Sequence, residues 1–158
     1  MLFRSGSRVL VVGAGGVGSA IAASLAAGGA AAISLFDSRA SSCEQLAKRI
    51  ADNCPGVELR TGSKDPAGHD LVVNATPMGM NPGDPMPLEM ARIEPDTFVC
   101  DVVHSQKPTA LLLAAQARGA RIQGGADMLF EQIPAYLEFF GLPTTTPDVL
   151  RGIAAASH

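Results

Sequence analysis

The amino-acid sequence predicts an α/β fold, a doubly wound parallel sheet of about six strands with helices on both faces. Short apolar runs alternate with helical patterns along the chain. Hydrophobic residues make up 47% of the chain and aromatic residues only 4%, so Val, Leu, Ile and Ala must fill the core, as in a sheet buried by Ala-rich helices. The first apolar run also leads directly into glycines, in VLVVGAGGVGSA.

The expected elements follow one another in a regular order. We expect strands where apolar residues run together, at residues 8–12, 31–36, 57–61, 70–74, 97–101 and 120–123. We expect helices at 16–27, 41–53, 108–119 and 126–140, and a short one at 148–156. Ser41 or Ser42 should cap the second helix, and Gly119 and Gly141 should end the third and fourth. Because helices separate the strands, the crossovers should be right-handed and the sheet parallel.

Composition limits the classes of function. The 158 residues are expected to form one domain, with a core at 8–141 and a tail at 142–158. The net charge of −3 without a basic patch argues against a nucleic-acid partner, and no apolar run is long enough for a membrane span. Cys43, Cys54 and Cys100 form no C-x-x-C pair and share no metal-ligand spacing with histidines, which predicts a reduced, cytoplasmic protein without a structural metal.

The glycine-rich segment is typical of a dinucleotide-binding loop, since a strand runs into G-x-G-x-x-G and then into a helix. Gly13 allows a tight turn, Gly15 lets a pyrophosphate approach the backbone, and Gly18 lets the helix lie close to the strand. The helix N-terminus offers unpaired N–H groups to the phosphates. Asp37, at the end of the second strand, is placed to bind the adenosine ribose and to repel a 2′-phosphate, which favours NAD. Arg39 could pair with that phosphate, so NADP is the alternative.

Polar segments follow three later strands. They read NATPMGM from residue 74, DVVHSQKPT from 101 and GGADMLFEQ from 124, and such strand ends meet at the ligand-binding edge of an open α/β sheet. In this order behind GAGGVGSA, these segments resemble the nicotinamide domain of the shikimate and quinate dehydrogenases, a Rossmann-type domain. The resemblance covers residues 8–141. It implies hydride transfer between NAD(P) and the ring hydroxyl of shikimate, quinate or a related cyclic hydroxy acid.

The resemblance also implies which residues form the site. Gln132 would reach the substrate. The cofactor-binding residues would be Gly13, Ala14, Gly15, Gly16, Val17, Gly18, Asp37, Ser38, Arg39, Asn74, Ala75, Thr76, Val102, His104, Gly125 and Met128. Val102 and Gly125 would face the nicotinamide, and Met128 would pack near its ring. The chain departs from the family pattern at Pro77, at His104 in place of Tyr and at Gln106 in place of Pro, which leaves the particular substrate open.

No catalytic residue is assigned within this chain. In the family a Lys and an Asp move the hydroxyl proton, and both belong to an upstream substrate domain that we expect to be absent from this chain. We therefore expect the cofactor half of a two-domain enzyme, inactive by itself, whose small-molecule acid binds through the other domain; a homodimer is an open alternative. Two other functions stay open: a dinucleotide-binding regulatory module without catalysis, and a Rossmann enzyme of the methylene-tetrahydrofolate dehydrogenase or glutamyl-tRNA reductase type.

Overall fold

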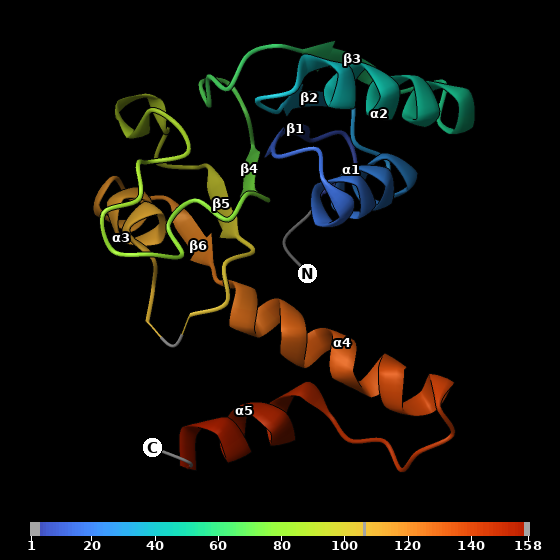
Figure 1. The fold of residues 1–158 in the computed structure, drawn as a ribbon, viewed down its shortest axis with the longest axis vertical. Helices are drawn as coiled ribbons and strands as arrows, with labels where there is room; N and C mark the ends of the chain where they lie inside the picture. The colour runs from blue at the N-terminus through green and yellow to red at the C-terminus, as the bar shows by residue number, and fades with distance from the viewer. Residues whose placement is uncertain (1–3, 106, 157–158) are drawn as a thin grey trace.

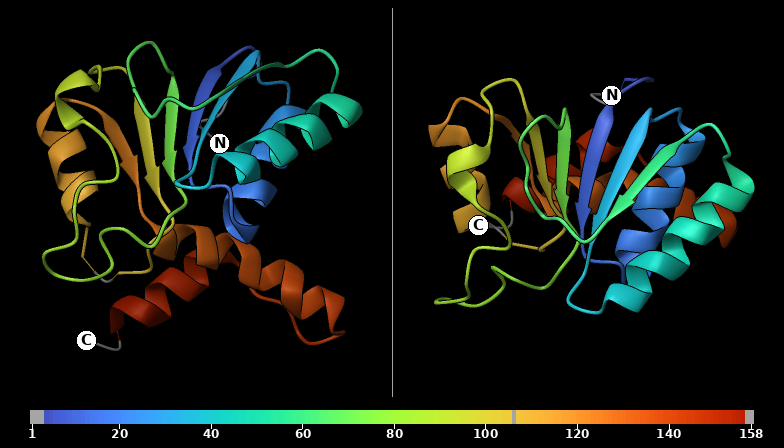
Figure 2. Two further views of the ribbon diagram at one scale, coloured as in Figure 1. Left: turned by 45° about the horizontal axis from the view of Figure 1, so that its top comes forward. Right: turned by 90° about the horizontal axis from the view of Figure 1, so that it is seen from above.

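The computed structural model describes residues 4–105 and 107–156, and within them six parallel strands form one sheet (Figures 1 and 2). The strands are β1 (Arg8–Val12), β2 (Ala32–Phe36), β3 (Glu58–Thr61), β4 (Leu71–Asn74), β5 (Phe98–Asp101) and β6 (Arg121–Gln123). They lie in the order β3-β2-β1-β4-β5-β6. The predicted doubly wound parallel sheet is thereby confirmed.

The described residues form five helices, three of which pack on the faces of this sheet (Figure 2). They are α1 (Gly16–Ala27), α2 (Ala40–Asn53), α3 (Ala110–Ala117), α4 (Gly125–Phe139) and α5 (Pro147–Ala156), with a short 3₁₀ turn, η1 (Met90–Arg92), before β5. Alternate strand residues point to opposite faces. One set packs with α1 and α2 into one buried cluster, and the other packs with α3 and the segment around η1 into a second cluster.

Two local features differ from the prediction. No serine caps α2: the helix begins at Ala40 with Arg39 as its N-cap and without a side-chain cap. Here the Asp37 carboxylate accepts the Arg39 N–H and organises the turn from β2 into the helix. The β4–β5 connection, for which no helix or strand was predicted, also contains η1 and buries Leu88 and Ile93 against the sheet. Gly119 and Gly141 do follow α3 and α4, with φ of 88° and 66°.

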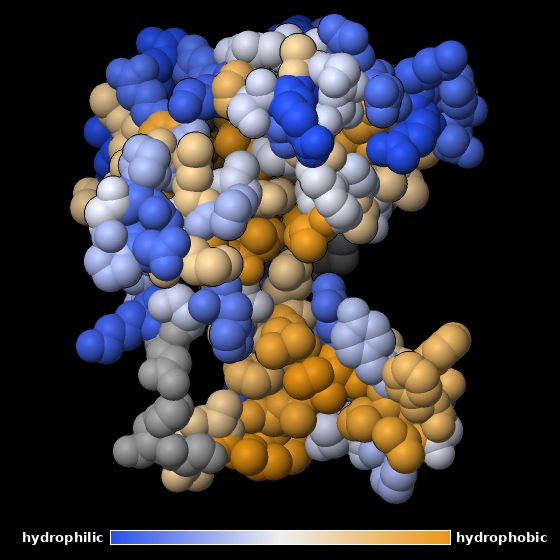
Figure 3. All heavy atoms as spheres, viewed as in Figure 1, coloured by the Kyte–Doolittle hydropathy of each residue, from blue (hydrophilic) through white to orange (hydrophobic). Residues whose placement is uncertain are grey.

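The last two helices lie apart from the sheet. α4 begins at the carboxyl end of β6, and α5 packs against α4 (Figure 1), where Arg151 pairs with Glu131 at 2.6 Å. Together they carry an exposed apolar surface (Figure 3), formed by Leu129, Tyr136, Phe139, Phe140, Leu142, Val149 and Ile153. None of the helices described is long and apolar enough to cross a membrane.

Candidate functional site

The candidate site lies at the carboxyl edge of the sheet. The strand register aligns Val12 with Phe36 and with Asn74, and Asn74 with Asp101, so the loops that follow β1, β2, β4 and β5 leave the sheet at one level. The strand order reverses between β1 and β4. In open α/β sheets, ligands bind outside such a switch point.

The glycine loop sits directly at the switch point. Gly13 has φ of 106°, and a Cβ there would lie 2.7 Å from the carbonyl oxygen of Ala75 in the β4 loop. A Cβ on Gly18 would lie 1.9 Å from the carbonyl oxygen of Gly13, so only glycine allows α1 to start this close to β1. The steric roles expected for these two glycines therefore match the geometry.

The outer part of the loop is open. A Cβ on Gly15 or Gly16 would meet no protein atom within 4 Å, and Val17 is 50% exposed. α1 has no side-chain cap and no acidic residue in its first turn. Its first N–H groups thus face an open space with the partial positive charge of a helix N-terminus, an arrangement that fits a diphosphate.

Asp37 is bound to the glycine loop. One carboxylate oxygen accepts the N–H of Ala14 at 2.8 Å, and the other accepts the N–H of Arg39 at 2.9 Å. These two backbone hydrogen bonds, aided by the Arg39 guanidinium and the Ser38 hydroxyl, lower the pKa of Asp37. The Asp37 side chain is 15% exposed and that of Arg39 is 74% exposed. Asp37 therefore holds the loop in shape, a structural role that the sequence did not indicate.

Asn74 and Asp101 form a buried polar node. Asn74 is completely buried: its amide donates to Asp101 Oδ1 at 3.0 Å and to the Met78 carbonyl at 3.1 Å. Its oxygen accepts from the N–H and hydroxyl of Thr76 at 3.1 and 2.6 Å. Asp101 also accepts the Thr109 hydroxyl at 2.7 Å. Both side chains are buried and fix the surrounding loops, so the cofactor-binding role expected for Asn74 stays a prediction.

Thr109 is a residue that sequence reasoning missed. Its hydroxyl donates to Asp101 and accepts the Leu112 N–H, which makes it the N-cap of α3. A threonine directly before the apolar run ALLL is a recognisable cap signal. Ala75 and Thr76, both half-buried, stay at the crevice beside the glycine loop.

The residues expected around the nicotinamide lie at the other end of this edge. Val102 and Met128 are half-buried and line one cavity, whereas His104 is exposed. Gly125 is buried, and a Cβ there would lie 2.5 Å from the Val102 carbonyl oxygen, so glycine is required for α4 to start against the β5 loop. Gln132 is exposed on α4 and accepts a hydrogen bond from the Tyr136 hydroxyl at 3.3 Å. Gln106 lies outside the described residues.

The cysteines show no sign of activation. All three are unpaired. Burial raises the pKa of the Cys100 thiol to about 12, and burial together with the nearby Asp37 raises the pKa of Cys43. Both shifts disfavour the thiolate, the form that acts as a nucleophile. Among the described residues, no three His, Cys, Asp or Glu side chains come together as a metal site.

The strand order, the open glycine loop and the aligned loops define the class: a Rossmann-type α/β domain. Residues 3–51, which include β1, α1 and β2, match the ThiF family. Among solved structures, the chain is similar to the quinate dehydrogenase of Corynebacterium glutamicum in complex with NAD (31% identity, TM-score 0.82, 96% of this chain and 56% of that one). It is similar to the ligand-free 5-ketofructose reductase of Gluconobacter sp. CHM43 (33% identity, TM-score 0.81, 92% of this chain and 54% of that one).

Curated relatives agree with these structures. The NADP(+) shikimate dehydrogenase of Acidiphilium cryptum is 36% identical over 148 residues, which cover 92% of this chain and 52% of that protein. The chain thus spans about half the length of the relatives it matches. Over 92–96% of its own length the chain is similar to such shikimate dehydrogenases, and it aligns with about half of each of them.

Proposed function

We propose that this chain is the dinucleotide-binding half of an NAD(P)-dependent dehydrogenase acting on shikimate, quinate or a related cyclic hydroxy acid. One observation carries the proposal. The open glycine loop, with uncapped N–H groups at the start of α1, stands at the switch point of the sheet. Relatives named for NADP, and a quinate dehydrogenase structure with NAD, support it.

Each part of the carboxyl edge has a role in this proposal. The glycine loop binds the pyrophosphate through backbone N–H groups, and the exposed part of Asp37 binds the adenosine ribose. Val102, Gly125 and Met128 surround the nicotinamide, and Gln132 reaches toward the acid. When bound, the nicotinamide supplies the hydride acceptor or donor. The other half of the enzyme supplies the Lys and Asp that move the hydroxyl proton, so the isolated chain should bind the cofactor without turnover.

The cofactor preference rests on Asp37. A carboxylate beside the ribose repels a 2′-phosphate, so we propose NAD first and NADP second. Two features soften this preference: backbone N–H groups bind both carboxylate oxygens, and the exposed Arg39 guanidinium lies 4.0 Å away. Titrations with NAD⁺ and NADP⁺ measure the ratio of the two dissociation constants directly.

Gly15→Val tests the cofactor site most sharply. A Cβ at this position meets no protein atom within 4 Å, so we expect the fold to be unaffected while the valine side chain fills the space of the diphosphate. We expect calorimetry to show at least a tenfold loss of dinucleotide affinity with an unchanged melting temperature. Gly56→Val, at a turn where a Cβ is equally unhindered, is the matched control and should bind normally. Equal affinity of the two variants would rule out the proposed diphosphate site.

The similarity to 5-ketofructose reductase favours a second candidate, reduction of a keto sugar, because that structure has the same degree of likeness. A keto sugar and a cyclic hydroxy acid are both compatible with the fold of this half. Joining the chain to the unmatched half of each relative and assaying both substrates would distinguish them.

Three further parts of the prediction also await measurement. The division into a core at 8–141 and a tail at 142–158 is testable by limited proteolysis, and the homodimer by sedimentation equilibrium. We propose a reducing, cytoplasmic setting because all three cysteines are unpaired; fractionation of the source cells would test it.

A further inference from the structure

A small polar cavity lies on the face of the sheet opposite α1 and α2. On β2, Ile33 and Leu35 pack with α1 and α2, so Ser34 between them points to the other face, in the same row as Leu10. The polar cavity lies between this face and the β3–β4 connection and has a volume of about 300 Å³. Its polar lining includes Arg8, Ser34, Arg60, Thr61, Ser63 and His69.

Ser34 and His69 form a hydrogen-bonded pair in the wall of the polar cavity. Ser34 is only 8% exposed, and its Oγ lies 3.0 Å from Nε2 of His69. Nδ1 of His69 lies 3.2 Å from the Pro66 carbonyl oxygen, which can only accept a hydrogen bond. In the neutral ring Nδ1 therefore carries the proton, and Nε2 accepts from the Ser34 hydroxyl. The pair fixes the β3–β4 connection over β2.

The face that carries the polar cavity departs from the usual pattern of a parallel sheet. Strands that are covered on both faces are rich in Val, Ile and Leu, whereas here Ser34 interrupts β2 and Arg60 lies beside it on β3. Positions that break such a rule are expected where a protein is strained or functional. In the described part of the chain no residue other than glycine has a positive φ, so backbone strain does not explain these polar residues.

Positive charge predominates around the polar cavity. Arg8 and Arg60 line it from β1 and β3. Within residues 4–105 and 107–156 the Arg8 guanidinium forms no ion pair, and the Arg60 side chain, paired with Glu58 at 2.7 Å, is still 54% exposed. The carboxylate in the lining belongs to Asp65, and Arg92 neutralises it at 2.7 Å. The balance of charge favours an anion.

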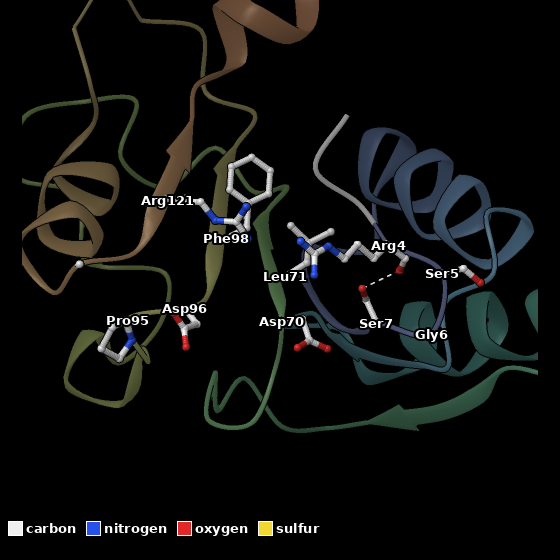
Figure 4. A pocket seen from close by; sticks show the side chains of 11 residues that line it. Arg4, Ser5, Gly6, Ser7, Asp70, Leu71, Pro95, Asp96, Phe98 and Arg121 are labelled. Atoms are coloured by element: carbon white, nitrogen blue, oxygen red, sulfur yellow. Dashed lines mark hydrogen bonds between the residues drawn. The ribbon is translucent and has the colours of Figure 1, made fainter.

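The acidic residue next in sequence lies outside the polar cavity. Asp70 follows His69 directly, but it lines a different cavity at the amino edge of the sheet, together with Arg4 and Asp96 (Figure 4). One Asp70 oxygen accepts the Arg8 N–H at 2.7 Å. Its carboxylate is thus bound to the backbone and leaves the Arg8 guanidinium available.

We propose that the polar cavity binds a phosphate group, either free or carried by a small metabolite. Guanidinium groups bind phosphate oxygens through pairs of charge-assisted hydrogen bonds, and Thr61 and Ser63 add hydroxyls on the β3 side. The Ser63 oxygen accepts the Asp65 N–H, so its hydroxyl hydrogen is left to donate. A volume of about 300 Å³ is at the lower end for ligand sites, which suits a small anion. The site shares no residue with the proposed dinucleotide site.

An NMR titration of this chain with inorganic phosphate tests the proposal. The ring signals of His69 should shift in a saturable manner, and sodium chloride at equal ionic strength should not reproduce the shift. Acetate, a planar monoanion, should bind at least fivefold more weakly. Glycerol 3-phosphate separates the two sources: tighter binding than inorganic phosphate identifies a metabolite ester, and weaker binding identifies free phosphate. Unmoved His69 signals, or an equal response to chloride or acetate, overturn the proposal.

Three variants locate the site. Arg8→Gln removes an exposed, unpaired cation and should weaken phosphate binding at least fivefold, and Arg60→Gln should act in the same direction. Arg49→Gln removes the same charge from an exposed position of α2, on the opposite face, and should bind within twofold of the unchanged chain. Equal dissociation constants for all three variants overturn the proposal. The affinity for NAD⁺ should be the same in all three, so a failure of the phosphate site and a failure of the dinucleotide site are seen separately.

Discussion

Replacing Asn74 with Leu tests whether this residue holds the site together from inside the protein. Leu has a similar volume but offers none of the four hydrogen bonds that Asn74 makes with Thr76, Met78 and Asp101. A buried polar group that loses its partner costs about 1–3 kcal/mol, and a charged one costs more. Asp101 keeps its bonds from the Val103 N–H and the Thr109 hydroxyl. We therefore expect a loss of about 3 kcal/mol in the free energy of unfolding.

That loss corresponds to a fall of about 6–12 °C in Tm for a domain of this size. The chain has no Trp and one Tyr, so urea unfolding is best followed by circular dichroism at the helix band. Asn53→Ala removes one exposed bond to the Arg49 carbonyl and should change stability by no more than about 0.5 kcal/mol. A loss below about 1 kcal/mol for Asn74→Leu would refute the reasoning. So would a loss of dinucleotide affinity without any loss of stability, since Asn74 would then act on the ligand directly.

Three further predictions concern the edge of the sheet. Gly18→Ala places a Cβ 1.9 Å from a backbone oxygen; α1 must shift, and we expect a loss of about 1–3 kcal/mol together with weaker dinucleotide binding, both absent in Gly152→Ala. Asp37→Asn should shift the ratio of dissociation constants toward NADP. Because the folded pKa of Asp37 is lowered, its carboxylate stabilises the fold above the unfolded pKa of about 3.9. That contribution disappears as the pH falls through the folded pKa. The difference in unfolding free energy between wild type and Asp37→Asn should therefore be present at pH 7 and vanish in acid, and a difference independent of pH would contradict this account. In the two-half enzyme, Gln132→Ala should raise KM for the acid while the Kd of the cofactor stays constant, and an unchanged KM would remove Gln132 from the substrate site.

Most of the fold could be predicted because local signals agree with one another. Apolar runs, bounded by turns that contain glycine, predicted the ends of each strand to within a residue or two, and the bounds of β1 at residues 8–12 were predicted without error. Gly13 and Gly18 could be assigned steric roles because their spacing fixes where the strand, turn and helix approach one another. The prediction that a serine caps α2 was wrong because the helix begins earlier, after a turn in which the Arg39 N–H donates to the Asp37 carboxylate.

The less predictable features depend on distant contacts. Asn74, at a strand end, is typical of a crevice residue, and its burial arises only because β5 brings Asp101 beside it. The cavity that Val102 and Met128 line is likewise not visible in the sequence, because segments far apart along the chain form it together.

The outward aromatic residues at the end of α4 have a practical consequence for preparing this protein. Phe139 and Phe140 are 81% and 70% exposed and belong to neither buried cluster. Replacing both by polar residues should therefore change the free energy of unfolding little while removing an exposed apolar patch that favours aggregation. A doubly substituted version offers a soluble reagent for ligand screening and crystallisation, with the glycine loop and its neighbours unaltered.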